Sequence, residues 1–104
     1  MKPAIPGIKD SESSLILNLF NALPVGTEII IFGSRAKGNY REGSDIDICL
    51  KKSGLKIKDL FLLSEKYDSL NLPWKLDIVI YESLEEPALK EHIDRVGKCL
   101  SIIS

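Results

Sequence analysis

Hydrophobic residues recur along the chain at helical spacing in three segments. The first predicted helix begins at Asp10 or Ser11 and runs to about Leu23, where Pro24 ends it. Its apolar stripe consists of Leu15, Ile16, Leu19, Phe20 and Leu23. A second helix is expected over residues 56–70. A third should begin at Glu85-Glu86-Pro87, with acids at the positive end of the helix dipole, and end at Gly97.

Short apolar runs between these segments predict strands. Residues 28–33 form a β-branched, continuously apolar run, which is typical of a strand buried on both faces. Residues 46–51 and 75–81 predict two more strands, and residues 98–103 leave room for a short last one. One helical turn is expected over residues 34–38. This order of elements predicts one small sheet covered by helices.

Length and charge limit the classes of protein to consider. The chain of 104 residues is long enough for one domain with its own core, preceded by an irregular leader over residues 1–10. A net charge of −1 argues against direct nucleic-acid binding, which usually needs a basic surface. No apolar run approaches the roughly 18 residues of a membrane span, and the N-terminal residues lack the apolar core of an export signal. Cys49 and Cys99 stand alone in apolar runs, and we expect buried free thiols in a cytoplasmic protein.

The most distinctive pattern is GSRAKGNYREGSDID at residues 33–47. Gly33 allows a ligand to approach the backbone closely, and Ser34 offers a hydroxyl and an N–H group where a helical turn begins, which is a favourable place for a phosphate. Arg35 and Lys37 add positive charge. The loop lacks the Lys-Ser/Thr of a P-loop and the second glycine of a GxGxxG dinucleotide motif, so neither is supported.

Three aspartates predict a cation site next to this loop. Asp45 and Asp47 are two residues apart on a predicted strand, so they face the same side with Cα atoms about 6.5–7 Å apart. Two carboxylates so close repel each other unless a cation lies between them. Asp77 interrupts the apolar run of the third strand and can reach the same metals if that strand lies beside the second. Hard oxygen ligands together with phosphate favour Mg²⁺ or Mn²⁺.

Each of these acids also has an ordinary structural interpretation. Asp45 and Asp47 could belong to a cap followed by the solvent face of a strand, and Asp77 could simply pair with Lys75. The combination of a glycine loop, an acid pair and a lone third acid favours a metal–phosphate site. We assign His92 to surface or packing, and Trp74 to a core or edge position rather than to stacking on a base.

These residues resemble a known family. Gly33-Ser34, ten residues, and then Asp45-Ile46-Asp47 match the GS-x10-DxD signature of the nucleotidyltransferase superfamily related to DNA polymerase β. The form GSRAKGNYREGSDIDICL is most similar to the minimal nucleotidyltransferases, or MNT proteins, of bacteria and archaea. The resemblance covers nearly the whole chain, so it implies a single domain over residues 1–104. The implied fold is α/β (α+β), with a small mixed sheet of three to four strands flanked by helices.

The resemblance also implies roles for the site residues. Asp45, Asp47 and Asp77 would be the catalytic acids and the ligands of two Mg²⁺ ions, with Mn²⁺ as a possible substitute, and Asp77 would help to take the acceptor's proton. Gly33 and Ser34 would hold the phosphates. Arg35 and Lys37 would help to hold the leaving pyrophosphate.

The function implied is Mg²⁺-dependent transfer of a nucleoside monophosphate, AMP from ATP, to a hydroxyl group. Minimal nucleotidyltransferases typically pair with a helical HEPN protein, so we expect an antitoxin that modifies a tyrosine of a HEPN-type toxin within a hetero-oligomer. One alternative is a non-catalytic nucleotide-binding module that acts by forming a stoichiometric complex with that partner. Transfer to a small molecule or an RNA is less favoured, because the chain shows neither room for a dedicated pocket nor a basic face.

Overall fold

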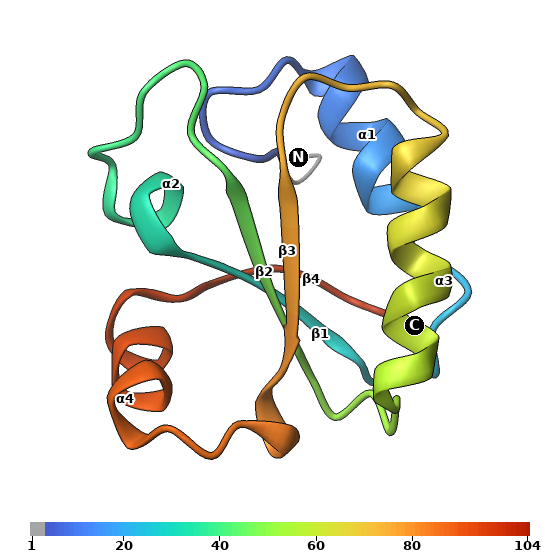
Figure 1. Ribbon diagram of the computed structural model, residues 1–104, viewed down its shortest axis with the longest axis vertical. Helices are drawn as coiled ribbons and strands as arrows, with labels where there is room; N and C mark the ends of the chain where they lie inside the picture. Colours follow the sequence, from blue (N-terminus) through green and yellow to red (C-terminus); the bar gives the residue numbers. More distant parts are fainter. Residues whose placement is uncertain (1–3) are drawn as a thin grey trace.

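A four-stranded mixed sheet in the order β3-β2-β1-β4 organises the chain, of which the computed structural model describes residues 4–104 (Figure 1). The strands are β1 Glu28–Phe32, β2 Ile46–Lys51, β3 Leu76–Ile80 and β4 Lys98–Ile102. The helices are α1 Asp10–Asn18, α2 Gly33–Lys37, α3 Ile57–Asp68 and α4 Pro87–Val96, with a 3-10 turn at Tyr81–Ser83. β1 pairs antiparallel with β2 and β4, whereas β2 pairs parallel with β3. The predicted small mixed sheet flanked by helices is confirmed, and the last strand is present.

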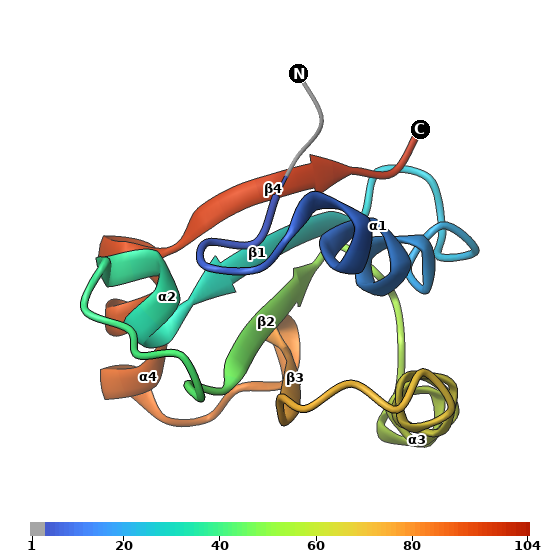
Figure 2. The same cartoon turned by 90° about the horizontal axis from the view of Figure 1, so that it is seen from above.

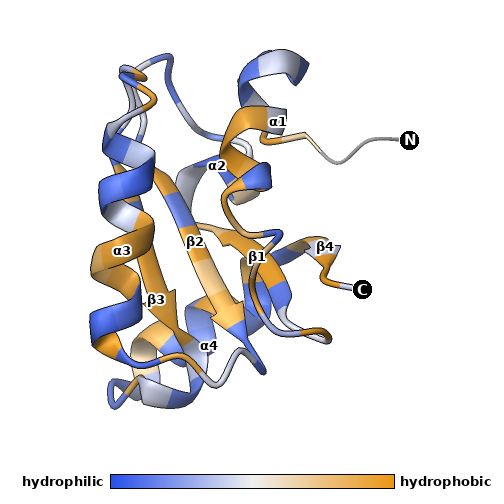
Figure 3. Cartoon of the chain, turned by 90° about the vertical axis from the view of Figure 1, so that its right-hand side faces the viewer, coloured by the Kyte–Doolittle hydropathy of each residue, from blue (hydrophilic) through white to orange (hydrophobic). Residues whose placement is uncertain are grey.

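Each face of the sheet carries its own apolar layer. On one face, side chains of β1 and β2 pack with Ile16 of α1 and with Leu63 and Tyr67 of α3. On the other face, Cys49 and neighbouring residues pack with Ile93 of α4. Figure 2 shows α1 and α3 on one side of the sheet and α4 on the other. Figure 3 shows that the central strands β1 and β2 are coloured largely hydrophobic, as expected for strands covered on both faces.

The segment before α1 is irregular, as predicted, but it belongs to the core. Ile5 and Ile8 are only 1% and 6% exposed. The Ile5 N–H donates to Ser13 Oγ at 3.1 Å, and the Ser13 hydroxyl donates to the Ile8 carbonyl at 3.3 Å. The leader proposed for residues 1–10 is therefore better described as a docked segment from residue 4 onward; residues 1–3 lie outside the described part of the chain.

The prediction for the end of the first helix was wrong, because α1 ends at Asn18 and not near Leu23. The N–H groups of Leu19 and Phe20 bond to carbonyls three residues back, at 3.1 and 3.0 Å, so the chain tightens into turns. The Asn21 side chain donates to Asn18 Oδ1 at 3.1 Å, and such local side-chain bonds compete with a regular helix. The tighter path places Phe20 in the core, where it is 0% exposed.

The remaining elements lie within two residues of their predicted ends, and the expected helical turn after β1 is present as α2. Both cysteines are free, but only Cys49 is buried; Cys99 is exposed on β4, which is an edge strand, so that part of the prediction was wrong. Within residues 4–104, no helix combines the length and apolar character needed to cross a membrane.

Candidate functional site

The parallel pairing of β2 and β3 brings the predicted acids to one end of the sheet. Asp47 lies directly opposite Asp77 in this pair, and neighbouring strands are about 4.8 Å apart. Asp45 immediately precedes β2 and is exposed. Because side chains alternate along a strand, Asp47 shares its face with Cys49, on the side of the sheet covered by α4. The third predicted strand does lie beside the second, and this adjacency brings Asp77 beside Asp47.

The electrostatics of Asp47 reflect this crowding. Partial burial raises the pKa of Asp47 above its ordinary value, and the negative charges of Asp77 and Asp45 raise the pKa further. His92 and Arg35 act in the opposite direction. A carboxyl group with a raised pKa beside two other acids is a typical feature of a functional site, since a nearby cation would relieve the repulsion.

The donor set fits a hard divalent cation. It consists of carboxylate oxygens, without the thiolate or imidazole ligands that zinc prefers. Asp77 also approaches Lys75, with 3.8 Å between Oδ1 and Nζ, but both side chains are substantially exposed (44% and 70%), so this pair is weak. Within residues 4–104, no three acidic, histidine or cysteine side chains already enclose a metal position. The structure thus places Asp47 beside Asp77 without gathering Asp45, Asp47 and Asp77 around one metal position.

Gly33 places the glycine loop directly against Asp47. Phe32, the last residue of β1, is the register partner of Asp47. The next residue, Gly33, has a φ of +74°, and a Cβ atom at this position would collide with the Asp47 carboxylate. Glycine is therefore required at position 33 both by the backbone conformation and by close packing. Ser34 is half-buried beside Gly33, and Lys37 is exposed at the end of α2.

Arg35 occupies an environment different from the one predicted. Its side chain is 2% exposed, and its guanidinium donates to the Pro6 carbonyl at 2.7 Å and to the Ser44 carbonyl at 2.8 and 3.3 Å. The guanidinium carbon lies 5.3 Å from the centre of the Tyr40 ring and 6.0 Å from that of Trp74. Because its N–H donors already bond to backbone carbonyls, Arg35 is not free to hold pyrophosphate, contrary to the prediction from the sequence. The sequence showed its charge but could not show its burial.

Trp74 takes part in the same cluster. Its indole N–H donates to the Glu42 carbonyl at 3.1 Å, and its own carbonyl accepts a bond from the Tyr67 hydroxyl at 2.6 Å. These bonds support the core or edge position that was preferred over stacking on a base.

His92 is a member of the site environment that sequence reasoning missed. It lies on α4 and packs edge-on against Phe32, with ring centres 6.3 Å apart and an interplanar angle of 80°. This contact confirms the predicted packing role. In addition, the charge of His92 acts to lower the pKa of Asp47. No signal in the sequence could have revealed this, because the position of α4 over the sheet depends on tertiary packing.

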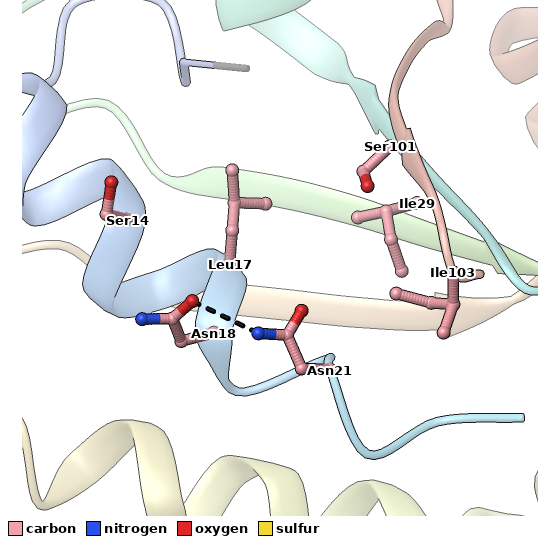
Figure 4. A pocket seen from close by; sticks show the side chains of 7 residues that line it. All are labelled: Ser14, Leu17, Asn18, Asn21, Ile29, Ser101 and Ile103. Carbon is pink, nitrogen blue, oxygen red and sulfur yellow. Dashed lines mark hydrogen bonds between the residues drawn. The ribbon is translucent and has the colours of Figure 1, made fainter. Parts of the chain in front are cut away.

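A separate pocket of about 310 Å³ lies between α1 and the edge strand β4 (Figure 4). Its lining is Ser14, Leu17, Asn18, Asn21, Ile29, Ser101 and Ile103. Since this lining carries no acid, histidine or cation, the pocket offers no chemistry for phosphate transfer.

Comparisons with known proteins agree with this geometry. The family model described as Polymerase beta, Nucleotidyltransferase matches residues 16–103, which include the glycine loop and all three acids. The probable protein adenylyltransferase MntA of Haemophilus influenzae is 26% identical over 80 residues, or 76% of this chain and 70% of the relative.

Solved structures show the same fold. A crystal structure of a toxin–antitoxin with AMP-PNP superimposes with a TM-score of 0.70 and 26% identity, covering 88% of this chain and 73% of that one. A mutant MntA–HpeT toxin–antitoxin gives a TM-score of 0.68 over 93% of this chain and 75% of that one. At 24% identity, the second match is evidence for the fold alone.

Proposed function

This chain belongs to the polymerase beta nucleotidyltransferase family, and we propose that it transfers AMP from ATP to a hydroxyl group of a partner protein. The observation that carries the proposal is the in-register placement of Asp47 opposite Asp77, with Gly33 packed against the Asp47 carboxylate. This arrangement joins a place for phosphate oxygens to a place for the cations that neutralise them.

The residues of the chain have distinct parts in this proposal. Asp45, Asp47 and Asp77 would hold two Mg²⁺ ions, or Mn²⁺, which would supply charge neutralisation and alignment of the triphosphate. The backbone at Gly33 and the N–H and hydroxyl groups of Ser34 would bind phosphate oxygens.

The proposed reaction is an in-line displacement. The acceptor oxygen bonds to the α-phosphorus as the bond to pyrophosphate breaks, and the Asp77 carboxylate helps to take the acceptor's proton. Lys37 is an exposed cation on α2, the short helix that also carries Ser34, and it would attract the leaving pyrophosphate.

The partner in this proposal is a helical HEPN-type toxin, held in a hetero-oligomer in the cytoplasm, so that the chain acts as an antitoxin. Two comparisons support the antitoxin role, whereas the HEPN type of the partner rests on the resemblance of the sequence. The MntA relative bears the name of a protein adenylyltransferase, and the solved neighbour at 26% identity is a toxin–antitoxin with AMP-PNP.

The test is label transfer from α-labelled ATP to the co-purified partner, in Mg²⁺ and in EDTA, followed by intact-mass measurement. We expect Mg²⁺-dependent addition of whole AMP units that is lost in Asp45→Ala. The matched control is Asp68→Asn, which removes an exposed carboxylate from the end of α3. Transfer that survives Asp45→Ala would contradict the proposal. Neutralisation of the partner by an Asp45/Asp47 double variant would favour a stoichiometric complex instead.

A further inference from the structure

We propose that Arg35 is a positioning residue, which acts with Pro6, Tyr40, Ser44 and Trp74 as a clamp that holds Asp45 in place for binding of Mg²⁺ and nucleotide. This inference rests on the proposed function of the acids. The segment before α1 thereby becomes part of the site. Neither the sequence pattern nor the family signature indicates this role.

The burial of Arg35 determines what its charge can do. At 2% exposure, the guanidinium has little access to solvent or to a ligand. A buried cation needs hydrogen-bond partners, and here backbone carbonyls and two aromatic rings take the place of a carboxylate. The planar fork of arginine reaches Pro6 and Ser44 at the same time, which a lysine ammonium, as a single point of charge, cannot reproduce.

The bonds to Ser44 fix the entry into β2. Nε and Nη2 of Arg35 both donate to the Ser44 carbonyl, which belongs to the peptide group joining Ser44 to Asp45. The Ser44 hydroxyl accepts a bond from the Arg41 N–H at 2.8 Å, and the Ser44 N–H donates to the Arg41 carbonyl at 3.0 Å. The Asp45 side chain is exposed, so packing around it does not fix its position. Its backbone is instead held by these bonds on one side and by the buried Ile46 on the other.

The segment before α1 closes the clamp from the other side. The Pro6 carbonyl accepts from Arg35 Nη1 at 2.7 Å. Gly7 has a φ of +82°, and a Cβ atom there would collide with the Tyr40 ring and approach Arg35 Nη1 to 2.9 Å. A methyl group at position 7 would therefore displace the clamp, although Gly7 is far from the acids in the sequence.

Two pairs of variants test the clamp. Arg35→Lys keeps the charge and removes the fork, and its control, Arg41→Gln, removes an exposed charge from the same loop. Gly7→Ala strains the backbone and pushes on the clamp. Its control, Gly26→Ala, carries a similar strain at φ +93° but places its Cβ in open space. The readouts are the emission of Trp74, the only tryptophan, and direct binding of ATP as Mg²⁺ is varied.

We expect Arg35→Lys and Gly7→Ala to shift Trp74 emission to the red. We also expect them to raise the Mg²⁺ concentration for half-maximal ATP binding about tenfold, as the loss of buried bonds to a charged group would predict. Arg41→Gln and Gly26→Ala should change neither quantity. Thermal unfolding of all four variants identifies any that are not folded at the assay temperature, and the Gly7 pair still decides the question if Arg35→Lys is one of them.

Three results would overturn the clamp. The first is a wild-type Mg²⁺ dependence in both Gly7→Ala and a folded Arg35→Lys. The second is an equal loss of ATP binding with and without Mg²⁺ in Arg35→Lys, because that would indicate direct contact with phosphate. The third is a similar effect of Gly7→Ala and Gly26→Ala, because that would indicate general strain. Failure of the proposed function looks different: a wild-type chain that binds no ATP with Mg²⁺ overturns both proposals, whereas wild-type binding without label transfer contradicts only the acceptor chemistry.

Discussion

Replacing Asp47 by asparagine should stabilise the metal-free protein while abolishing nucleotidyl transfer. Asp47 and Asp77 are register partners in parallel strands, which places their backbones about 4.8 Å apart. Two unit charges at 4 Å repel by about 1 kcal/mol in water and by about 4 kcal/mol at an effective dielectric constant of 20. Because the Asp77 side chain is 44% exposed, the lower limit applies. We therefore expect a gain of about 1 kcal/mol in the free energy of unfolding, or about 4 °C in Tm for a chain of this size.

The stability difference between Asp47→Asn and the wild type should depend on pH, in a direction set by the pKa shift of Asp47. Burial, and then the charges of Asp77 and Asp45, raise the pKa of Asp47 in the folded state. The folded protein therefore binds a proton more tightly than the unfolded chain, so ionisation of Asp47 lowers stability as the pH rises above the ordinary aspartate pKa of about 3.9. The advantage of Asp47→Asn should be fully present at neutral pH, shrink as Asp47 becomes protonated, and vanish in acid.

The assay is thermal unfolding of the wild type and Asp47→Asn without metal, from about pH 7 down to the ordinary aspartate pKa of about 3.9. The control is Glu65→Gln, which neutralises an exposed carboxylate on α3 and should leave Tm nearly unchanged. A second series with Mg²⁺ and ATP should raise Tm of the wild type only, because ligands stabilise the state that binds them. A lower or unchanged Tm of metal-free Asp47→Asn at neutral pH would refute the repulsion argument.

Two further predictions concern the glycine loop and the thiols. Gly33→Ala should destabilise the protein by about 2–4 kcal/mol and remove transfer activity, because it adds a collision with Asp47 to the backbone strain. The control Gly38→Ala has a φ of +89° and places its Cβ in open space, so it should cost only the backbone strain of about 1–2 kcal/mol. Equal free energies of unfolding for the two variants would contradict this account. Burial raises the pKa of the Cys49 thiol to about 11. A maleimide at pH 8 should therefore label exposed Cys99 in the folded protein but leave Cys49 unmodified until unfolding, as peptide mass mapping would show.

The sheet and the acid cluster could be predicted because they depend on local pattern. The β-branched run before Gly33 is short, apolar and bounded by turn residues, so few alternatives to a buried strand exist. Asp77 stands out in the sequence as a charge inside an apolar run, and the order of the strands places it near the second strand, whereas its position directly opposite Asp47 is a feature of the structure. The sequence could suggest that β3 lies beside β2 but not the register between them.

The features that were missed depend on contacts between distant segments. Pro6 and Gly7 resemble loop residues in the sequence, yet the same segment carries the buried Ile5 and bonds to Arg35. Arg35 itself resembles a phosphate ligand, because charge is visible in a sequence and burial is not. The early end of α1 has a local cause in the asparagine pair at its last turn, which helical periodicity alone does not weigh.

The parallel register of β3 against β2 makes the proposed active site more sensitive to insertions than the fold is. β3 is an edge strand, so it is held to the sheet on one side only. One extra residue in the connection after α3 could be absorbed by the loop, but one extra residue inside β3 ahead of Asp77 would turn that carboxylate to the opposite face. Such a chain could still fold and bury its core, and it would have lost the third acid. Over evolutionary time, changes of length should therefore gather in the loop before β3 and be absent between Leu76 and Asp77 in active members of the family.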